Sequence, residues 1–265
     1  MNLGKIVWLA GNIPVIGQIL RYFVRRYPEG SVVTMRYGYA AGYKWKRSHR
    51  YVNGYWIGHY ELPVQEAIVR ELSPGDIFFD VGANAGFFTL VAAKRVGSSG
   101  KCVAFEPLPD NAKNIIEQVR LNGLGFCFVV EEALSSQEGV TNFFYDTPGT
   151  STAHLGDIKA GERAIAVKTT TLDKAIQQWG LPVLIKMDIE GGEIDALKGA
   201  TTLLEQKTPK FLIELHGPVC EEKVRHILSN YGYSFFDLSG KFIEAGKPLP
   251  SHIVAKKPDK ISICD

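Results

Sequence analysis

The sequence predicts an α/β protein with a doubly wound, mostly parallel sheet and an appendage at its N-terminus. Three observations support this class. From residue 62 onward, apolar runs of strand length alternate with segments of helical period. A glycine-rich turn follows the first of these runs. The chain of 265 residues is 45% hydrophobic, which is enough to bury the core of one large domain.

The alternation of apolar runs and helical periods predicts the elements in chain order. We expect strands at residues 77–81, 101–107, 126–134, 182–188 and 210–215, and helices at 63–72, 87–96, 110–124, 170–180, 193–206 and 221–232. Asp110 is the expected N-cap of its helix. Residues 141–146 and 164–169 predict a small hairpin, and 233–238 with 252–257 predict an antiparallel pair at the end of the sheet.

The charge is distributed unevenly along the chain. Residues 1–60 hold nine Lys or Arg against one acid, a net +8, which leaves −6 for the rest of a chain whose net charge is +2. This composition predicts two regions: a basic, aromatic appendage at 1–60 and the catalytic domain at 61–265. The appendage is expected to serve as a substrate lid, or as a contact with a partner or a membrane.

Residues 1–30 combine an apolar run with a basic end. The run, residues 6–20, is too short to span a bilayer and lacks a cleavage site typical of a signal peptide. We expect a helix that packs on the domain or on a second subunit of a homo-oligomer; peripheral contact with a membrane surface is the alternative. Four cysteines without a CxxC pair favour a reducing, cytoplasmic location. The basic run 44–50 has no accompanying RNA-binding motif, so we expect no nucleic acid partner.

The turn after the first strand points to a ligand. Ligands of open α/β sheets bind outside the carboxyl ends of the strands, where Gly82, Asn84 and Gly86 lie. The turn departs from the dinucleotide motif G-x-G-x-x-G, because Asn84 replaces its second glycine and Phe87 fills its third glycine position. A site for a pyrophosphate is therefore disfavoured.

An acid at the tip of the second strand completes the pattern. Glu106 follows Gly86 by twenty residues, a spacing that suits hydrogen bonds to the hydroxyls of a ribose. A nucleoside without a diphosphate, such as S-adenosylmethionine, fits both features, with its amino-acid end over the turn and Asp80 near its ammonium group. Alternatively, Glu106 caps the next helix and the glycines only make a tight turn. The joint spacing favours the cofactor.

Several motifs in one order resemble the FkbM family of S-adenosylmethionine-dependent methyltransferases. They are "FFDVGANAGFFTL", "VAFEPLPDNAKNI", "TTTLDKAI" and "LIKMDIEGGEIDALKGA". The resemblance implies a class I methyltransferase (Rossmann-like) fold, a doubly wound seven-stranded sheet with strand order 3-2-1-4-5-7-6. It places Asp80, Gly82, Asn84, Gly86 and Glu106 at cofactor-binding positions, and Glu132 and Ala133 beside the adenine. It covers residues 54–216 and names no acceptor.

The catalytic groups are expected at the carboxyl ends of the fourth and fifth strands. Asp188 and Glu190 follow one strand, and Glu214 and His216 follow the other. His216 is the favoured general base, because an ordinary histidine titrates near neutral pH. Asp188 is expected to contact the cofactor and to take part in catalysis. A divalent metal such as Mg²⁺ is not favoured; Asp188, Glu214 and His216 would hold it.

The aromatic segment 54–61 is expected to contact the acceptor through Trp56, His59, Tyr60 and Glu61, although a hydrophobic lid would have the same composition. These features together predict an O-methyltransferase that acts on a hydroxyl of a sugar, a saccharide or a natural product. An N-methyltransferase on the same fold is one alternative. A non-catalytic, membrane-associated protein that binds a nucleoside is the other.

Overall fold

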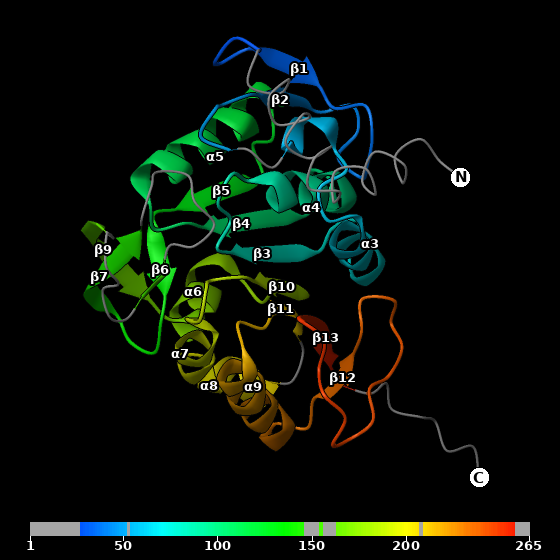
Figure 1. The fold of residues 1–265 in the computed structure, drawn as a ribbon, viewed down its shortest axis with the longest axis vertical. Coiled ribbons are helices and arrows are strands. Elements are labelled where there is room, and N and C mark those ends of the chain that lie inside the picture. Colours follow the sequence, from blue (N-terminus) through cyan, green and yellow to red (C-terminus); the bar gives the residue numbers. More distant parts are fainter. Residues whose placement is uncertain (1–26, 52–53, 146–153, 156–162, 207–208, 258–265) are drawn as a thin grey trace, which may run out of the picture.

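A seven-stranded sheet between two layers of helices forms the centre of the molecule (Figure 1). The computed structural model describes residues 27–51, 54–145, 154–155, 163–206 and 209–257. The strand order is β12-β13-β11-β10-β3-β4-β5, and β13 is antiparallel to both of its neighbours. Numbered along the chain within this sheet, the order is 3-2-1-4-5-7-6. The expected class I methyltransferase topology is therefore confirmed.

The central strands are β3 (Ile77–Val81), β4 (Lys101–Phe105), β5 (Cys127–Val130), β10 (Leu184–Met187), β11 (Lys210–Glu214), β12 (Ser234–Phe236) and β13 (His252–Lys256). One face carries α3 (Leu62–Glu71), α4 (Phe87–Val96) and α5 (Pro109–Leu121), and the other carries α6 (Leu172–Trp179), α7 (Glu193–Lys198), α8 (Thr201–Gln206) and α9 (Pro218–Asn230). The smaller sheets comprise β1 (Val32–Thr34) with β2 (Lys44–Lys46), and β6 (Glu132–Leu134), β7 (Gly139–Tyr145), β8 (His154–Leu155) and β9 (Arg163–Thr170).

Successive side chains of β3 enter opposite cores, as the pleat of a strand buried on both faces requires. Phe78 packs in the cluster under α3 and α4, and Phe79 packs in the cluster under α6 to α9. Both side chains are fully buried. The continuous apolar run of this strand thus follows from its position at the middle of the sheet.

Two predicted elements are divided in the structure. The run 126–134 forms β5 in the central sheet and β6 in the four-stranded sheet, where β6 pairs with β9. The predicted helix 193–206 becomes α7 and α8, which meet at Gly199. A Cβ atom on Gly199 would lie 2.2 Å from the carbonyl oxygen of Ser135, so only glycine allows this close approach. The expected hairpin is present as β7 and β9.

The helix α5 begins differently from the prediction. Leu108 is its N-cap residue and makes no side-chain cap, whereas Asp110 lies in the first turn. The Asp110 carboxylate instead pairs with Arg50 at 2.8 Å. A partner from the N-terminal segment therefore replaces the expected capping bond.

Residues 27–51 and 54–60 pack into the core of the larger domain. Met35, Trp45 and Tyr55 share one buried cluster with Phe87 of α4. Backbone amides of β2 also donate to side chains of α5, as Lys46 N does to Gln118 Oε1 at 2.9 Å. The expected boundary at residue 60 thus does not separate two cores. Residues 1–26, which carry most of the predicted partner or membrane segment, lie outside the described residues. Within the described ranges, no helix is long and apolar enough to cross a bilayer.

We expect Gly199→Ala to lower the free energy of unfolding by about 1–3 kcal/mol, because the added methyl group must displace the backbone of Ser135. Gly125→Ala is the matched control, since a Cβ at Gly125 meets no atom within 4 Å. Denaturant unfolding of both variants measures the difference. Equal stability of the two variants would contradict the close approach at Gly199.

Candidate active site

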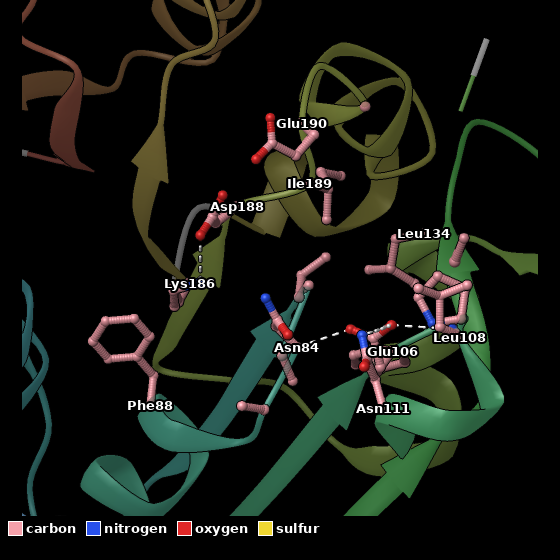
Figure 2. Close-up of a pocket in the computed structure, with 18 of the residues that line it drawn as sticks. Asn84, Phe88, Glu106, Leu108, Asn111, Leu134, Lys186, Asp188, Ile189 and Glu190 are labelled. Atoms are coloured by element: carbon pink, nitrogen blue, oxygen red, sulfur yellow. Dashed lines mark hydrogen bonds and ion pairs between the residues drawn. The ribbon is translucent and has the colours of Figure 1, made fainter. Parts of the chain in front are cut away.

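A cavity lies at the carboxyl ends of β3, β4 and β10 (Figure 2) and, with the open solvent at its mouth included, holds about 870 Å³ of empty space. The sheet changes winding direction between β3 and β10, so this is where an open α/β sheet binds its ligand. The wall includes four segments that the sequence predicted: the turn after β3, the end of β4, the segment 132–134 and the segment after β10. Tyr55, Tyr60 and Phe143 line it from other parts of the chain.

The turn after β3 owes its shape to left-handed residues at alternate positions. Gly82, Asn84 and Gly86 have φ values of 76°, 49° and 83°. A Cβ atom on Gly82 would lie 2.0 Å from the carbonyl oxygen of Asp188. The turn therefore packs directly against the segment after β10. Gly82 and Asn84 line the cavity, whereas Gly86 lies behind it, against Ile115 of α5.

The carboxylate of Glu106 faces the cavity and is held from several sides (Figure 2). Its Oε2 accepts a hydrogen bond from Asn84 N at 2.8 Å. Its Oε1 accepts bonds from Leu108 N at 3.0 Å and from Asn111 Nδ2 at 3.3 Å. Burial raises the pKa of Glu106 to about 7, although these three donors oppose the shift. A carboxylate in this setting can exchange a proton near neutral pH.

Asp80 lies beneath the cavity and does not line it. Its Oδ2 accepts a hydrogen bond from Thr89 Oγ1 at 2.6 Å, and its Oδ1 lies 3.9 Å from Lys186 Nζ. Burial would lower the pKa of Lys186, but the charges of Asp188 and Asp80 raise it above its usual value. The cation of Lys186 therefore lies between Asp80 and the expected cofactor, and Asp188, 3.3 Å from Nζ, is the acid that reaches the cavity.

The expected adenine end is largely apolar. Glu132 and Ala133 line the cavity there, as the resemblance implied. Leu108, Leu134 and Phe143 line it with them. Sequence reasoning missed Phe143, because β7 belongs to a hairpin whose position depends on pairing with β9. An apolar slot with one carboxylate at its edge suits a flat heterocycle.

A histidine at the rim is oriented by a buried carboxylate. His216 Nδ1 donates to Glu193 Oε1 at 3.0 Å, and the Glu193 side chain is fully buried. This bond leaves His216 Nε2 facing Glu190 Oε2 at 3.5 Å and Asp188 Oδ1 at 3.7 Å. The hydrogen bond to Glu193 raises the pKa of His216 to about 9, so the imidazole is protonated at pH 7. The expectation that His216 titrates near neutrality therefore needs correction.

The same rim holds an excess of carboxylates. The acids are Glu61, Asp188, Glu190, Glu193 and Glu214, and the basic groups are Lys186, His216 and His252. Sequence reasoning missed His252, which faces Glu214 across the pairing of β11 and β13 and lies 3.3 Å from its carboxylate. Burial raises the pKa of Glu190 to about 6, with His216 opposing the shift. Proton exchange between neighbouring groups is thus available at the rim.

Asp188, Glu214 and His216 place potential ligand atoms within 4.8 Å of one another. This is the set that the sequence predicted for a metal, should one bind. Each of the three has another partner: Lys186 lies 3.3 Å from Asp188, His252 lies 3.3 Å from Glu214, and Glu193 lies 3.0 Å from His216. A divalent ion would compete with these partners for its ligands.

The predicted acceptor residues are divided between the cavity and the surface around it. Tyr60 lines the cavity, and so does Tyr55, which the sequence analysis did not assign to the acceptor site. Glu61 lies 4.0 Å from His252 at the rim. Trp56 and His59 do not line the cavity, because their rings pack on Tyr27 and Tyr37.

Backbone strain is concentrated at this site. Among the described residues, the non-glycine residues with positive φ are Glu61, Asn84 and Glu190. Asn84 and Glu190 line the cavity, and Glu61 lies at its rim. Strained residues gather at functional sites, where the surrounding structure holds them. The side-chain Oδ1 of Asn84 is also buried without a partner among the described residues, which fits a ligand that donates a hydrogen bond there.

Comparisons with known proteins identify the family of this chain. The family described as "Methyltransferase FkbM domain" matches residues 80–235. The hexuronic acid methyltransferase AglP of Haloferax volcanii is 27% identical over 171 residues, which are 64% of this chain and 68% of that protein.

Two solved structures are more distant in sequence. A methyltransferase FkbM from Methylobacillus flagellatus is 16% identical, with a TM-score of 0.47; the match covers 93% of this chain and 60% of that one. Aeropyrum pernix fibrillarin, solved with S-adenosyl-L-methionine, is 11% identical, with a TM-score of 0.41 and 72% coverage of each chain. The family match spans more than half of the sequence, and the chain belongs to the FkbM family of S-adenosylmethionine-dependent methyltransferases.

Proposed function

We propose that this protein transfers a methyl group from S-adenosylmethionine to a hydroxyl of a sugar or saccharide. The observation that carries the proposal is His216 at the rim of the cavity, with Nδ1 held by Glu193 and Nε2 directed toward Asp188 and Glu190. A hydroxyl needs a positioned base more than an amine does, because it must lose its proton to become a good nucleophile. The relative that methylates a hexuronic acid supports a saccharide acceptor.

The cavity residues would hold the cofactor along its length. Glu106 would accept hydrogen bonds from the ribose, and the turn 82–86 would cradle the amino-acid end. Leu108, Leu134 and Phe143 would enclose the adenine. When bound, the cofactor supplies an electrophilic methyl group on its sulfonium.

The residues at the rim would prepare the acceptor. His216 Nε2 takes the proton of the acceptor hydroxyl after it has released its own proton to solvent, and Glu193 holds the ring in place through Nδ1. Asp188 and Glu190 stabilise the imidazolium that forms, from 3.7 and 3.5 Å. Alignment of the acceptor above the cavity supplies the larger part of the rate, roughly 7–11 kcal/mol of barrier.

We expect affinity for S-adenosylmethionine to fall as the pH is lowered through about 7, because protonated Glu106 loses the charge that attracts the ribose hydroxyls. Glu106→Gln should weaken binding by about 1.5–3 kcal/mol at pH 8 and remove this pH dependence. Calorimetry measures both effects across about pH 5.5–8.5, roughly one and a half units on either side of the Glu106 pKa of about 7. Glu71→Gln, at a buried carboxylate outside the cavity, is the control. A pH-independent affinity in the unmodified protein would contradict the role of Glu106.

We expect kcat to rise with pH toward a plateau above about 9, because His216 must be deprotonated to act as a base. Glu193→Gln should move this limb to lower pH, since it removes the charge that raises the histidine pKa. His216→Ala should lower kcat by about 10²–10⁴-fold and leave cofactor affinity unchanged. The pH–rate profile is the measurement, and Asp195→Asn is the matched control because Asp195 pairs with Lys198 on the exposed side of α7. If the rise of kcat with pH stays at the same pH in Glu193→Gln, His216 is not the base that this rise reports.

We expect labelled methyl groups to appear on saccharide hydroxyls, and to do so in the presence of EDTA. The measurement is transfer from methyl-labelled S-adenosylmethionine to panels of saccharides and of amines. Transfer to amines alone would favour the N-methyltransferase alternative. Cofactor binding without transfer to any acceptor would favour the non-catalytic alternative. If EDTA abolishes activity and Mg²⁺ restores it, the acceptor hydroxyl would instead be activated by a metal held by Asp188, Glu214 and His216.

A further inference from the structure

A chain of hydrogen bonds connects the N-terminal segment to the carboxylate at the end of β4. The hydroxyl of Tyr51 donates to Asn111 Oδ1 at 2.8 Å. The side-chain amide of Asn111 then donates through Nδ2 to Glu106 Oε1 at 3.3 Å. Tyr51 comes from the segment that precedes α3, and Asn111 lies in the first turn of α5. Sixty residues of sequence separate Tyr51 from Asn111.

All three members of this chain are buried. Tyr51 is 8% exposed, Asn111 is 2% exposed and Glu106 is 4% exposed. Water therefore competes little for these bonds, and a buried amide that lost one partner would carry the full cost of its desolvation. The two neighbours together favour one orientation of the Asn111 amide. Its oxygen accepts from the tyrosine hydroxyl, and its nitrogen donates to the carboxylate, which can only accept when it is ionised.

The hydrogen-bonding capacity of Glu106 makes this orientation important. An ionised carboxylate offers about four lone-pair positions. Asn84 N, Leu108 N and Asn111 Nδ2 occupy three of them. The position that remains is on Oε2, the oxygen that receives only the bond from Asn84. If the amide of Asn111 turned around, its oxygen would face Oε1 and repel the ionised form that the ribose requires.

The segment that carries Tyr51 is fixed to α5 by further contacts. Arg50 pairs with Asp110 at 2.8 Å, and Lys46 pairs with Glu117 at 2.7 Å. The ring of Tyr51 contacts the ring of Tyr55, whose side chain lines the cavity. The position of the tyrosine hydroxyl thus depends on how this segment docks on α5.

We propose that Tyr51 is a positioning residue for cofactor binding, which holds the Asn111 amide with its nitrogen toward Glu106 and so keeps the carboxylate ready for the ribose. This inference rests on the proposed role of Glu106 in binding S-adenosylmethionine. It assigns part of the cofactor site to the segment 27–60, which the family match at residues 80–235 does not include. The basic, aromatic appendage is then a structural part of the nucleoside site.

The other charged groups near Glu106 come from several elements. Asp80 on β3 also raises the pKa of Glu106, and Glu132 of β6 lines the same cavity. On the side of Tyr51, Arg50 and Asp110 form a pair near the tyrosine hydroxyl. Tyr51→Phe changes none of these charges. A change in the titration of Glu106 in that variant therefore reports the orientation of Asn111.

The test compares two buried tyrosine hydroxyls. Tyr51→Phe removes the bond to Asn111 and keeps the ring in place. Tyr233→Phe is the matched control, because its hydroxyl donates to the carbonyl oxygen of Pro209 at 3.1 Å, and Tyr233 does not line the cavity. We expect Tyr51→Phe to weaken S-adenosylmethionine binding about 3- to 10-fold at neutral pH. The pH below which affinity falls should also move upward, whereas Tyr233→Phe should change neither quantity.

A double-mutant cycle separates positioning from general loss of stability. In an Asn111→Ala background, Tyr51→Phe should weaken binding no further, because the hydroxyl acts only through the amide. Equal penalties with and without Asn111 would overturn the proposal, and so would a Tyr51→Phe profile that matches Tyr233→Phe. Denaturant unfolding of each variant confirms that the comparison is between folded proteins. The unmodified protein and Glu106→Gln are measured first. If the two bind the cofactor equally well, the proposed role of Glu106 fails. If Glu106→Gln binds more weakly, the result for Tyr51→Phe tests the positioning role by itself.

Discussion

The site depends on one buried carboxylate. Removal of a charge from water costs several kcal/mol unless hydrogen bonds compensate for it, and Glu106 is 4% exposed. Its donors are Asn84 in the turn after β3, Leu108 before α5 and Asn111 in α5. Those donors are in place only when β3, β4 and α5 are correctly assembled. The fold and the proposed recognition of a nucleoside therefore depend on the same constraint.

An excess of carboxylates surrounds the opposite end of the cavity, at its rim. Five carboxylates surround three basic groups at the rim, and Lys186 connects the two ends because it lies between Asp80 and Asp188. The excess negative charge keeps His216 protonated at neutral pH, since Glu193, Glu190 and Asp188 all raise its pKa. A base with a high pKa is strong once deprotonated but is rarely deprotonated at pH 7. The raised pKa of His216 follows from its hydrogen bond to the buried Glu193 carboxylate. The same bond keeps a proton on Nδ1 when the ring is neutral.

The sequence predicted those parts of the structure that local pattern determines. The bounds of β3 and α4 match the predicted 77–81 and 87–96, because an apolar run and a glycine turn define them locally. The cavity residues Gly82, Asn84 and Glu106 follow from the turn and its spacing to the next strand, whereas Glu132 and Ala133 were assigned only through the family resemblance. The division of 193–206 at Gly199 depends on contact with Ser135, which is far away in sequence. Tyr51, Phe143 and His252 were missed because only tertiary packing brings them to the site.

We infer that the cavity after β3 binds the cofactor with its ribose on Glu106 and its sulfur toward the rim. A crystal structure with S-adenosylhomocysteine would show this arrangement. We expect ribose hydroxyls within hydrogen-bond distance of Glu106 Oε2, adenine between Leu108 and Phe143, and the sulfur on the side of Asp188 and His216. A ribose bound away from Glu106, or a sulfur directed away from His216, would contradict it.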